Sequence, residues 1–311
     1  MSDSGIDLVA GGSGFIGSHL CEALLAAGRT VRVVDDLATG YRHNLEGLQL
    51  EFVEGDAADP EVAARACEGV AHIYHLAARP SVPWSFEHPE AAYHANHQTT
   101  LSLIEAGAAA GARRIVFSSS SAIYGDGPEL PKRESLPPAP QSPYAEHKLA
   151  GERALHEAHA AGRIEAVSLR YFNVYGPRQD PTSPYSGVIS LFAKWVREGT
   201  RPTIFGDGKQ TRDFVYVADV ARANMLAMQA ALDECAPVLN VATERSIELL
   251  TLWETICEAA GVPALEPEFL PARTGDVRES VASLAKTRAA IGFEPEVELL
   301  KGLQATLASG A

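Results

Sequence analysis

The chain has 311 residues, enough for one large α/β domain and a smaller lobe. With 46% hydrophobic and 21% charged residues, its composition is typical of a soluble globular protein. Its net charge of -14 argues against a general nucleic-acid binder or a protein of anionic membranes, although a local arginine cluster could still hold an anionic ligand. The four cysteines form no C-x-x-C pair, and the sequence carries neither a leader-like N-terminus nor a membrane-length apolar run, so we expect reduced thiols, no metal site and a cytoplasmic protein.

Short β-rich runs alternate with helical stretches along the first half of the chain, which is typical of a parallel sheet with crossover helices. The pattern predicts a doubly wound α/β fold of the Rossmann type over residues 1–173, to which the chain returns in part around 213–242. A smaller, mixed α/β lobe is expected over 174–311. Strands are expected near Leu8, Val31, Phe52, Ile73, Val116 and Val167, and helices near 15–27, 61–66, 89–107, 143–159 and 186–198.

A glycine-dense turn follows the first expected strand. Gly11, Gly14 and Gly17 have the spacing G-x-x-G-x-x-G, which departs from the dinucleotide fingerprint G-x-G-x-x-G. The physical demands are similar, because one glycine makes the turn, one admits a pyrophosphate and one lets the helix pack on the strand. The anion would then lie at the positive end of a helix that begins at Phe15 and Ile16. The alternative is a structural turn without a ligand.

Acidic and small residues follow the next strands. Asp35, with Asp36 behind it, ends the second strand close to the interval at which such folds place a carboxylate on the adenosine ribose. An acid there repels a 2'-phosphate, so NAD is favoured over NADP. Asp56 follows the third strand, and Ala77 and Ala78 follow the fourth, at the edge where an open α/β sheet presents its ligand.

A run of four serines, 118–121, ends the fifth strand, and the next helix begins at Ser142 and Pro143 with a natural N-cap and first-turn residue. Tyr144 and Lys148 lie four residues apart on one face of that helix. A phenol with a pKa of about 10 is a poor base at neutral pH. A neighbouring ammonium, a cationic nicotinamide and the helix N-terminus would all favour the phenolate. Alone, the pair is an ordinary amphipathic one; after the glycine turn, the acid and the serines, it indicates catalysis.

Residues 10–19 and 33–40 closely resemble the extended short-chain dehydrogenase/reductase family, and more narrowly its sugar-nucleotide 4-epimerase branch. The resemblance implies bound NAD and a UDP-sugar substrate. It also implies a homodimer formed by pairing the helices near 89–107 and 143–159. The implied catalytic set is Ser120, Tyr144 and Lys148, with Ser121 as an alternative hydroxyl, and the further cofactor contacts are Asp56, Ala77, Ala78 and Asn96.

The same resemblance separates related reactions. Sugar-nucleotide 4,6-dehydratases carry Thr-Asp-Glu where Ser120, Ser121 and Ala122 stand here, and nucleotide-sugar decarboxylases keep the acid at the position of Ala122. Without that carboxyl no evident group would drive elimination. Simple epimerisation, by transient oxidation at C4 with tightly held NAD, is therefore the implied reaction.

The second half of the chain continues the resemblance through 170–178, 206–217 and 271–280. By resemblance, Asn173, Arg212 and Arg273 hold the diphosphate and Asp276 the nucleoside ribose, with Arg178 and Val188 as further substrate contacts. Two arginines suit a diphosphate because their hydrogen bonds to it are charge-assisted and bidentate.

Ser280 departs from the pattern of strict UDP-glucose epimerases. These often carry a bulky tyrosine at this position, beside the sugar C2 substituent. A serine leaves room for an N-acetyl group, so we expect UDP-GlcNAc and UDP-GalNAc as substrates, with UDP-Glc and UDP-Gal as additional ones. A UDP-glucuronate 4-epimerase, with Arg178 as the carboxylate partner, is an alternative. A non-catalytic NAD-binding regulator is another, against which the intact Ser120, Tyr144 and Lys148 argue.

Overall fold

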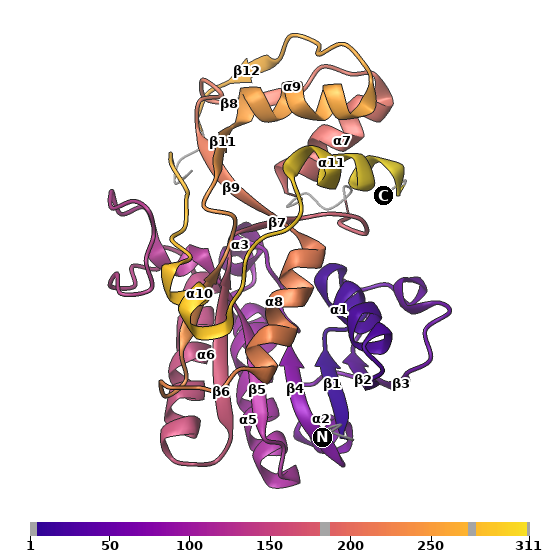
Figure 1. The fold of residues 1–311 in the computed structure, drawn as a ribbon, viewed down its shortest axis with the longest axis vertical. Helices are drawn as coiled ribbons and strands as arrows, with labels where there is room; N and C mark the ends of the chain where they lie inside the picture. The colour runs from indigo at the N-terminus through magenta and orange to yellow at the C-terminus, as the bar shows by residue number, and fades with distance from the viewer. Residues whose placement is uncertain (1–4, 181–186, 273–277, 310–311) are drawn as a thin grey trace.

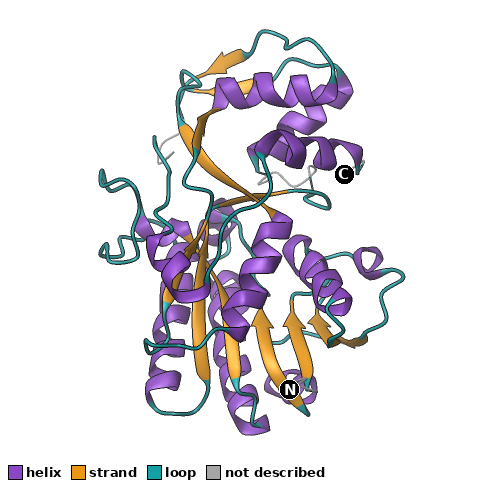
Figure 2. Cartoon of the chain, in the orientation of Figure 1, coloured by secondary structure: helices purple, strands orange, loops and turns teal. Residues whose placement is uncertain are grey.

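The larger part of the molecule is built on one seven-stranded sheet (Figures 1 and 2). The computed structural model describes residues 5–180, 187–272 and 278–309. Every strand pairing in the sheet is parallel, so the carboxyl ends of the strands meet at one edge. The predicted fold class is confirmed. The strands, from one side of the sheet to the other, are β3 (Glu51–Glu54), β2 (Thr30–Asp35), β1 (Ile6–Ala10), β4 (Val70–His75), β5 (Arg114–Ser120), β6 (Glu165–Tyr171) and β10 (Val238–Val241).

Helices cover both faces of this sheet, as a parallel sheet requires. One face packs against α2 (Pro60–Cys67), α5 (Thr99–Ala110) and α6 (Pro143–Ala160). The other packs against α1 (Phe15–Ala26), α8 (Val217–Gln229) and α10 (Ala285–Ile291) (Figure 1). Leu8, Val9 and Ala10 of β1 are fully buried, because the strand is covered from both sides.

The predicted start of α6 is confirmed in detail. The Ser142 hydroxyl oxygen accepts a hydrogen bond from the Ala145 amide at 3.2 Å, and Pro143 takes the first helical position. The helix expected near 89–107 is divided: α4 (Pro89–Tyr93) runs into a π-helical turn (His94–Gln98) and then into α5. A short helix α3 (Val82–Glu87), absent from the expectations, precedes it. Two 3-10 turns occupy Arg42–Leu45 and Ser121–Tyr124.

The smaller lobe has a core of its own, in which Phe192, Trp253 and Leu303 are buried together. Its helices are α7 (Val188–Glu198), α9 (Leu249–Ala260) and α11 (Leu299–Ala308), which lie together above the large sheet in Figure 1. Its strands form two small sheets, one of β11 (Ser246–Glu248), β9 (Thr211–Tyr216) and β7 (Asn173–Tyr175), the other of β12 (Glu268–Leu270) and β8 (Thr203–Phe205).

The chain passes between the two parts more than once. After β9, helix α8 packs on α1 and β10 joins the large sheet beside β6. Helix α10 then packs against β10 and α8, so residues near 285–291 also lie on the larger part, which the expected boundaries do not include. None of the helices within the described ranges is long and apolar enough to cross a membrane.

Candidate active site

The glycine turn fits a dinucleotide phosphate. Gly11 has a φ of +81°, and a Cβ there would lie 2.6 Å from the backbone nitrogen of Ala77, so only glycine is tolerated. A Cβ on Gly17 would lie 2.1 Å from the carbonyl oxygen of Gly11, which explains the close packing of helix on turn. Helix α1 has no side-chain N-cap and no acid in its first turn. Its first amides, at Phe15 and Ile16, therefore lie at an end suited to an anion.

Two cavities lie beside this turn, and Gly11 and Gly14 line both of them. Cavity A, of about 330 Å³, includes the expected cofactor residues Gly11, Gly14, Asp35, Asp36, Asp56, Ala77 and Ala78 in its lining. Cavity B, of about 510 Å³, includes Gly11, Gly14, Phe15, Ile16, Gly17, Ala78, Tyr144 and Lys148. The residues present therefore form one continuous lining from the acid of β2 to the Tyr/Lys pair of α6, which fits NAD.

Asp35 supports the turn as well as lining cavity A. Its carboxylate accepts hydrogen bonds from the Ser13 amide at 2.8 Å and from the Leu37 amide at 2.9 Å. The carboxyl is buried, and burial raises its pKa, while the two amides act in the opposite direction. The acid is thus fixed in position before any ribose arrives.

Asn96, an expected cofactor residue, supports the backbone of a residue in the cavity lining. It is buried and lines neither cavity A nor cavity B; its side-chain oxygen accepts from the Arg79 amide at 2.7 Å, and its amide donates to the Arg79 carbonyl at 3.3 Å. Arg79 itself lines both cavities, with its guanidinium 5.5 Å from the Trp84 ring centroid. The sequence pattern gave no signal for Arg79 or Trp84, since neither belongs to a motif.

The expected catalytic residues come together where cavity B meets cavity C. Cavity C, of about 580 Å³, is lined by Ser120, Ser121, Tyr144 and Ser280 among others. Tyr144 lines both cavities, and the Ser120 hydroxyl is near enough to act on its pKa. The Lys148 ammonium donates to the Ser118 carbonyl at 2.7 Å and lies 5.9 Å from the Tyr144 ring centroid. A hydroxyl, a phenol and an ammonium thus share one junction between two cavities.

Burial dominates the electrostatics of this junction. Burial raises the pKa of Tyr144, against the effect of the Ser120 hydrogen bond, and burial lowers the pKa of Lys148 to about 7, against the effect of Glu152. The protein groups alone therefore do not lower the pKa of Tyr144, contrary to the expectation for its lysine and helix end. Lowering it requires a further positive charge, which the nicotinamide ring of bound NAD+ would supply.

A buried ion pair is formed one helical turn after Lys148 on α6. Arg170 of β6 donates to both carboxylate oxygens of Glu152, at 2.9 and 2.7 Å, and both side chains are at most 5% exposed. The Ser119 hydroxyl donates to the same carboxylate at 2.5 Å. The Arg170 guanidinium also lies 4.6 Å from the Tyr124 ring centroid. Helix α6 is therefore joined to β5 and β6 one turn beyond the lysine.

Helix α3 separates the cavities and contacts the catalytic helix. Trp84 lines cavities A and B, and Phe86 lines cavity C. Between them, the fully buried Ser85 accepts a hydrogen bond from the Tyr144 amide at 3.2 Å and donates to the Val82 carbonyl at 2.6 Å. A residue 59 positions away thus holds the first turn of α6 beside the cavity walls.

The expected substrate residues divide into three groups. Asn173 and Arg212 line cavity C and also cavity D, a space of about 760 Å³ between the lobes that includes Val188. Arg178 lines none of the cavities A to D. Arg273 and Asp276 lie outside the described residues. Aromatic and polar residues that the sequence pattern did not single out, Phe205 and Gln210, also line cavity D.

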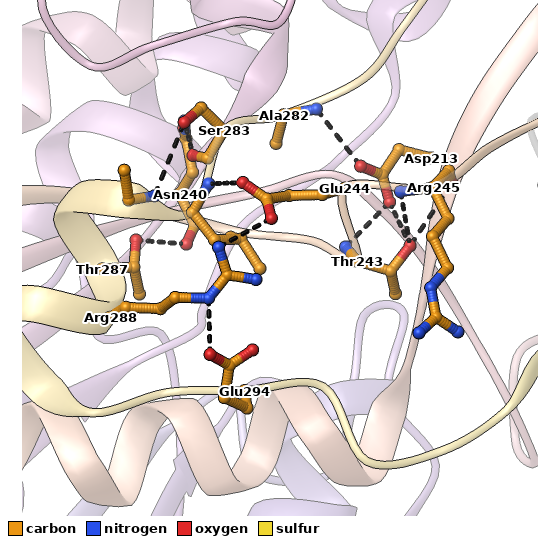
Figure 3. Close-up of polar contacts among 12 residues, drawn as sticks. Asp213, Asn240, Thr243, Glu244, Arg245, Ala282, Ser283, Thr287, Arg288 and Glu294 are labelled. Atoms are coloured by element: carbon orange, nitrogen blue, oxygen red, sulfur yellow. Dashed lines mark hydrogen bonds and ion pairs between the residues drawn. The ribbon is translucent and has the colours of Figure 1, made fainter.

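Asp213, next to Arg212, holds the chain at Ala282, two residues beyond Ser280 (Figure 3). Its buried carboxylate accepts from the amide and hydroxyl of Thr243, at 2.8 and 2.6 Å, and from the Ala282 amide at 3.2 Å. Glu244 accepts from the Leu284 amide and pairs with Arg288 at 2.7 Å. These contacts fix the chain at 282–288, and with it the segment that carries Ser280 to cavity C.

This chain resembles known proteins along most of its length. A sequence model for the NAD dependent epimerase/dehydratase family matches residues 8–242. The UDP-glucose 4-epimerase of Mycolicibacterium smegmatis is 38% identical over 306 residues, covering 96% of each protein. The structure of a UDP-N-acetylglucosamine 4-epimerase from Methanobrevibacter ruminantium M1, in complex with UDP-N-acetylmuramic acid, has a TM-score of 0.93 at 35% identity and covers 100% of this chain and 99% of its own. The UDP-glucose 4-epimerase of Thermotoga maritima with UDP-glucose has a TM-score of 0.93 at 37% identity, covering 98% of each chain.

We expect Ser85→Ala to lower both stability and turnover. The change leaves the buried Tyr144 amide without its acceptor, which costs about 1–3 kcal/mol in the free energy of unfolding. Because the Tyr144 ring is then less well held, we also expect turnover to fall by about tenfold. Denaturant unfolding and steady-state kinetics measure the two effects.

The matched control is Ser102→Ala. Ser102 is also a buried helical serine, whose hydroxyl donates to the Ala58 carbonyl at 2.8 Å, but it lines none of the cavities A to D. This variant should lose stability while keeping its turnover. Equal turnover in the two variants would contradict a positioning role for Ser85.

Proposed function

Because the chain belongs to the NAD-dependent epimerase/dehydratase family, we propose that this NAD-dependent enzyme, a UDP-sugar 4-epimerase, interconverts UDP-GlcNAc and UDP-GalNAc and also accepts UDP-Glc and UDP-Gal. The observation that carries the proposal is the junction at Tyr144, which lines both the cofactor-side cavity B and cavity C. A phenol there reaches a sugar on one side and the dinucleotide on the other. We also propose a cytoplasmic location.

The residues at the junction have separate tasks. Tyr144 Oη removes the proton from the sugar 4-hydroxyl, and Ser120 Oγ hydrogen-bonds to the 4-oxygen and assists the proton's path. Lys148 binds the nicotinamide ribose and, when protonated, favours the Tyr144 phenolate. Bound NAD supplies a reversible hydride acceptor at C4. After the 4-keto sugar has rotated to present its other face, Tyr144 returns the proton to the 4-oxygen. The enzyme is then back in its initial protonation state.

The diphosphate has to stay bound while the sugar turns. Arg212 and Asn173 line both cavity C and cavity D, so they suit a group that joins a sugar to a nucleoside. Arg273, outside the described residues, is proposed as a second diphosphate ligand and Asp276 as a ribose ligand. A firm anchor at this point allows the sugar pocket itself to remain permissive.

The small side chain of Ser280 supports the N-acetyl specificity. Ser280 lines cavity C, as do Ser121 and Ala122, whose side chains are also small. A tyrosine at 280 would fill space beside the sugar. The contacts of Asp213 and Glu244 fix the adjoining chain, which argues that the space is maintained.

The geometry of the described residues gives the two alternatives less support than the main proposal. Arg178, the candidate carboxylate partner for UDP-glucuronate, donates to Ser18 and Glu22 on α1 and lines none of the cavities A to D. A non-catalytic regulator need not keep Ser120, Tyr144 and Lys148 together at a cavity junction. Both remain as outcomes of the experiment below.

The first test is incubation of the purified protein, without added cofactor, with UDP-GlcNAc, UDP-Glc and UDP-GlcA separately, while proton NMR follows the anomeric signals. We expect UDP-GlcNAc to convert to its C4 epimer. Tyr144→Phe should reduce turnover by at least about a hundredfold while retaining NAD, measured by absorbance after denaturation. Conversion of UDP-GlcA alone would overturn the specificity, and undiminished activity of Tyr144→Phe would overturn the mechanism.

We expect Ser280→Tyr to act on substrate choice. The added ring should lower kcat/KM for UDP-GlcNAc by at least about tenfold and change that for UDP-Glc much less, because only the N-acetyl group needs the space. Ser280→Ala, which keeps the space, is the matched control and should retain both activities. Unchanged use of UDP-GlcNAc by the tyrosine variant would show that other walls set the specificity.

We also propose a homodimer through α4, α5 and α6. Tyr93 is 45% exposed on this face, and its ring lies 5.2 Å from that of His97 and 5.7 Å from that of His147. Light scattering should give twice the mass of one chain, and Tyr93→Asp should shift the protein towards monomer because it introduces a charge into the interface. Phe269→Asp, at an exposed aromatic residue of the smaller lobe, should have no such effect. Monomer mass for the wild type would refute the dimer.

A further inference from the structure

The segment Pro177–Asp180, which we term the clasp, has contacts that the proposed reaction does not use. It follows β7 and was expected to contact substrate through Arg178. Instead, Gln179 holds the smaller lobe: its side-chain nitrogen donates to the Val174 carbonyl at 3.1 Å, and its oxygen accepts from the Ser190 hydroxyl at 2.7 Å. The residues around Gln179 contact the larger part of the molecule.

Three of those contacts are made with α1. The Arg178 guanidinium donates to the Ser18 hydroxyl at 2.9 Å and pairs with the Glu22 carboxylate. The His19 ring lies 3.0 Å from the Pro177 carbonyl and donates to it, since a carbonyl only accepts. Burial lowers the pKa of His19, which keeps the ring neutral near pH 7. The helix whose N-terminus faces cavity B is therefore attached to the clasp along its first two turns.

The fourth contact lies in the wall of cavity B itself. The Tyr41 hydroxyl donates to the Asp180 carboxylate at 2.9 Å. Both residues line cavity B, Tyr41 from the loop after β2 and Asp180 from the clasp. Since both side chains come from segments far apart in the sequence, this hydrogen bond joins two separate walls of the space beside the glycine turn.

The backbone of the clasp supports the same interpretation. Arg178 has a φ of +67°, in the left-handed region that disfavours a residue with a Cβ by about 1–2 kcal/mol. Such conformations persist where the surrounding contacts enforce them, and they cluster at functional sites. The Arg178 guanidinium contacts both Ser18 and Glu22, and these two contacts enforce the conformation of Arg178.

We propose that Arg178 and Asp180 are positioning residues for the dinucleotide, which fasten the clasp to α1 and Tyr41 and thereby slow release of the cofactor. The inference rests on the proposed function, because an epimerase restores its cofactor in every turnover and has no need to release it. A dehydrogenase that exchanges cofactor would be slowed by such a closure. The clasp follows β7, the strand that carries Asn173 of the substrate cavities.

Cofactor release can be measured separately from epimerisation. Each variant is loaded with NAD+, freed of excess by gel filtration, and mixed with alcohol dehydrogenase and ethanol, so that every released NAD+ appears as NADH absorbance. Tyr41→Phe removes only the hydrogen bond to Asp180 at a residue that is 44% exposed, so the fold should persist. We expect its release rate to rise by about two- to tenfold.

Arg178→Ala removes the contacts with Ser18 and Glu22 together and should raise the NAD+ release rate by at least about tenfold. Arg178→Lys, which keeps the charge but reaches one partner, should lie between Arg178→Ala and wild type. The matched control is Arg163→Ala, because Arg163 forms an exposed ion pair with Glu105 near the amino end of β6, at the opposite edge of the sheet. Its release rate should equal that of wild type.

Wild-type release rates in both Tyr41→Phe and Arg178→Ala would overturn the proposal, as would a wild type that loses its NAD+ during gel filtration. A wild type that retains NAD+ but epimerises no UDP-sugar would instead overturn the proposed function and leave the release measurements standing. Denaturant unfolding of each variant separates faster release from loss of the fold: a release rate that rises only in proportion to lost stability counts against the clasp.

Discussion

The buried ion pair between Glu152 and Arg170 is the interaction on which the geometry of the site depends. Two charges removed from water are stable only when nearly every hydrogen-bonding atom is satisfied, so the pair tolerates little displacement. Glu152 receives both guanidinium hydrogen bonds and the Ser119 hydroxyl. An apolar helix could rotate or slide on an apolar sheet with small cost. We infer that this pair fixes the rotation of α6, and with it the places of Lys148 and Tyr144, one and two turns earlier.

The same burial that fixes these residues determines their protonation. A low-dielectric surrounding disfavours both the Tyr144 phenolate and the Lys148 ammonium, and the charge of Glu152 offsets this only for the lysine. Without the cofactor, the protein therefore favours the neutral phenol. A cationic nicotinamide ring beside Tyr144 would act in the opposite direction and favour the phenolate.

Local sequence explains what could be predicted. The glycine turn, the acid of β2, the Ser142 cap and the Tyr144/Lys148 pair each depend on spacing within a few residues of one element, and the alternation of elements brings them to one sheet edge. Contacts between distant segments could not be predicted, because no spacing encodes them: Ser85 with Tyr144, Glu22 with Arg178, Asp213 with Ala282. The contact of Asn96 with the backbone of Arg79, which lines the cavity, likewise joins segments that no local spacing connects.

The two ends of the site are held to different degrees, and this difference suits an epimerase. On the cofactor side, Asp35 is fixed by two amides and α1 by the clasp, so little can move. On the sugar side, the lining of cavity C includes hydroxyls and small side chains at 120–122 and 280, which constrain a sugar less than bulky groups would. A keto sugar that must present both faces needs that freedom, whereas hydride transfer in both directions needs a fixed partner. Because β7 carries Asn173 and leads directly into the clasp, the proposed anchor of the moving substrate and the proposed restraint on the cofactor belong to one continuous stretch of chain.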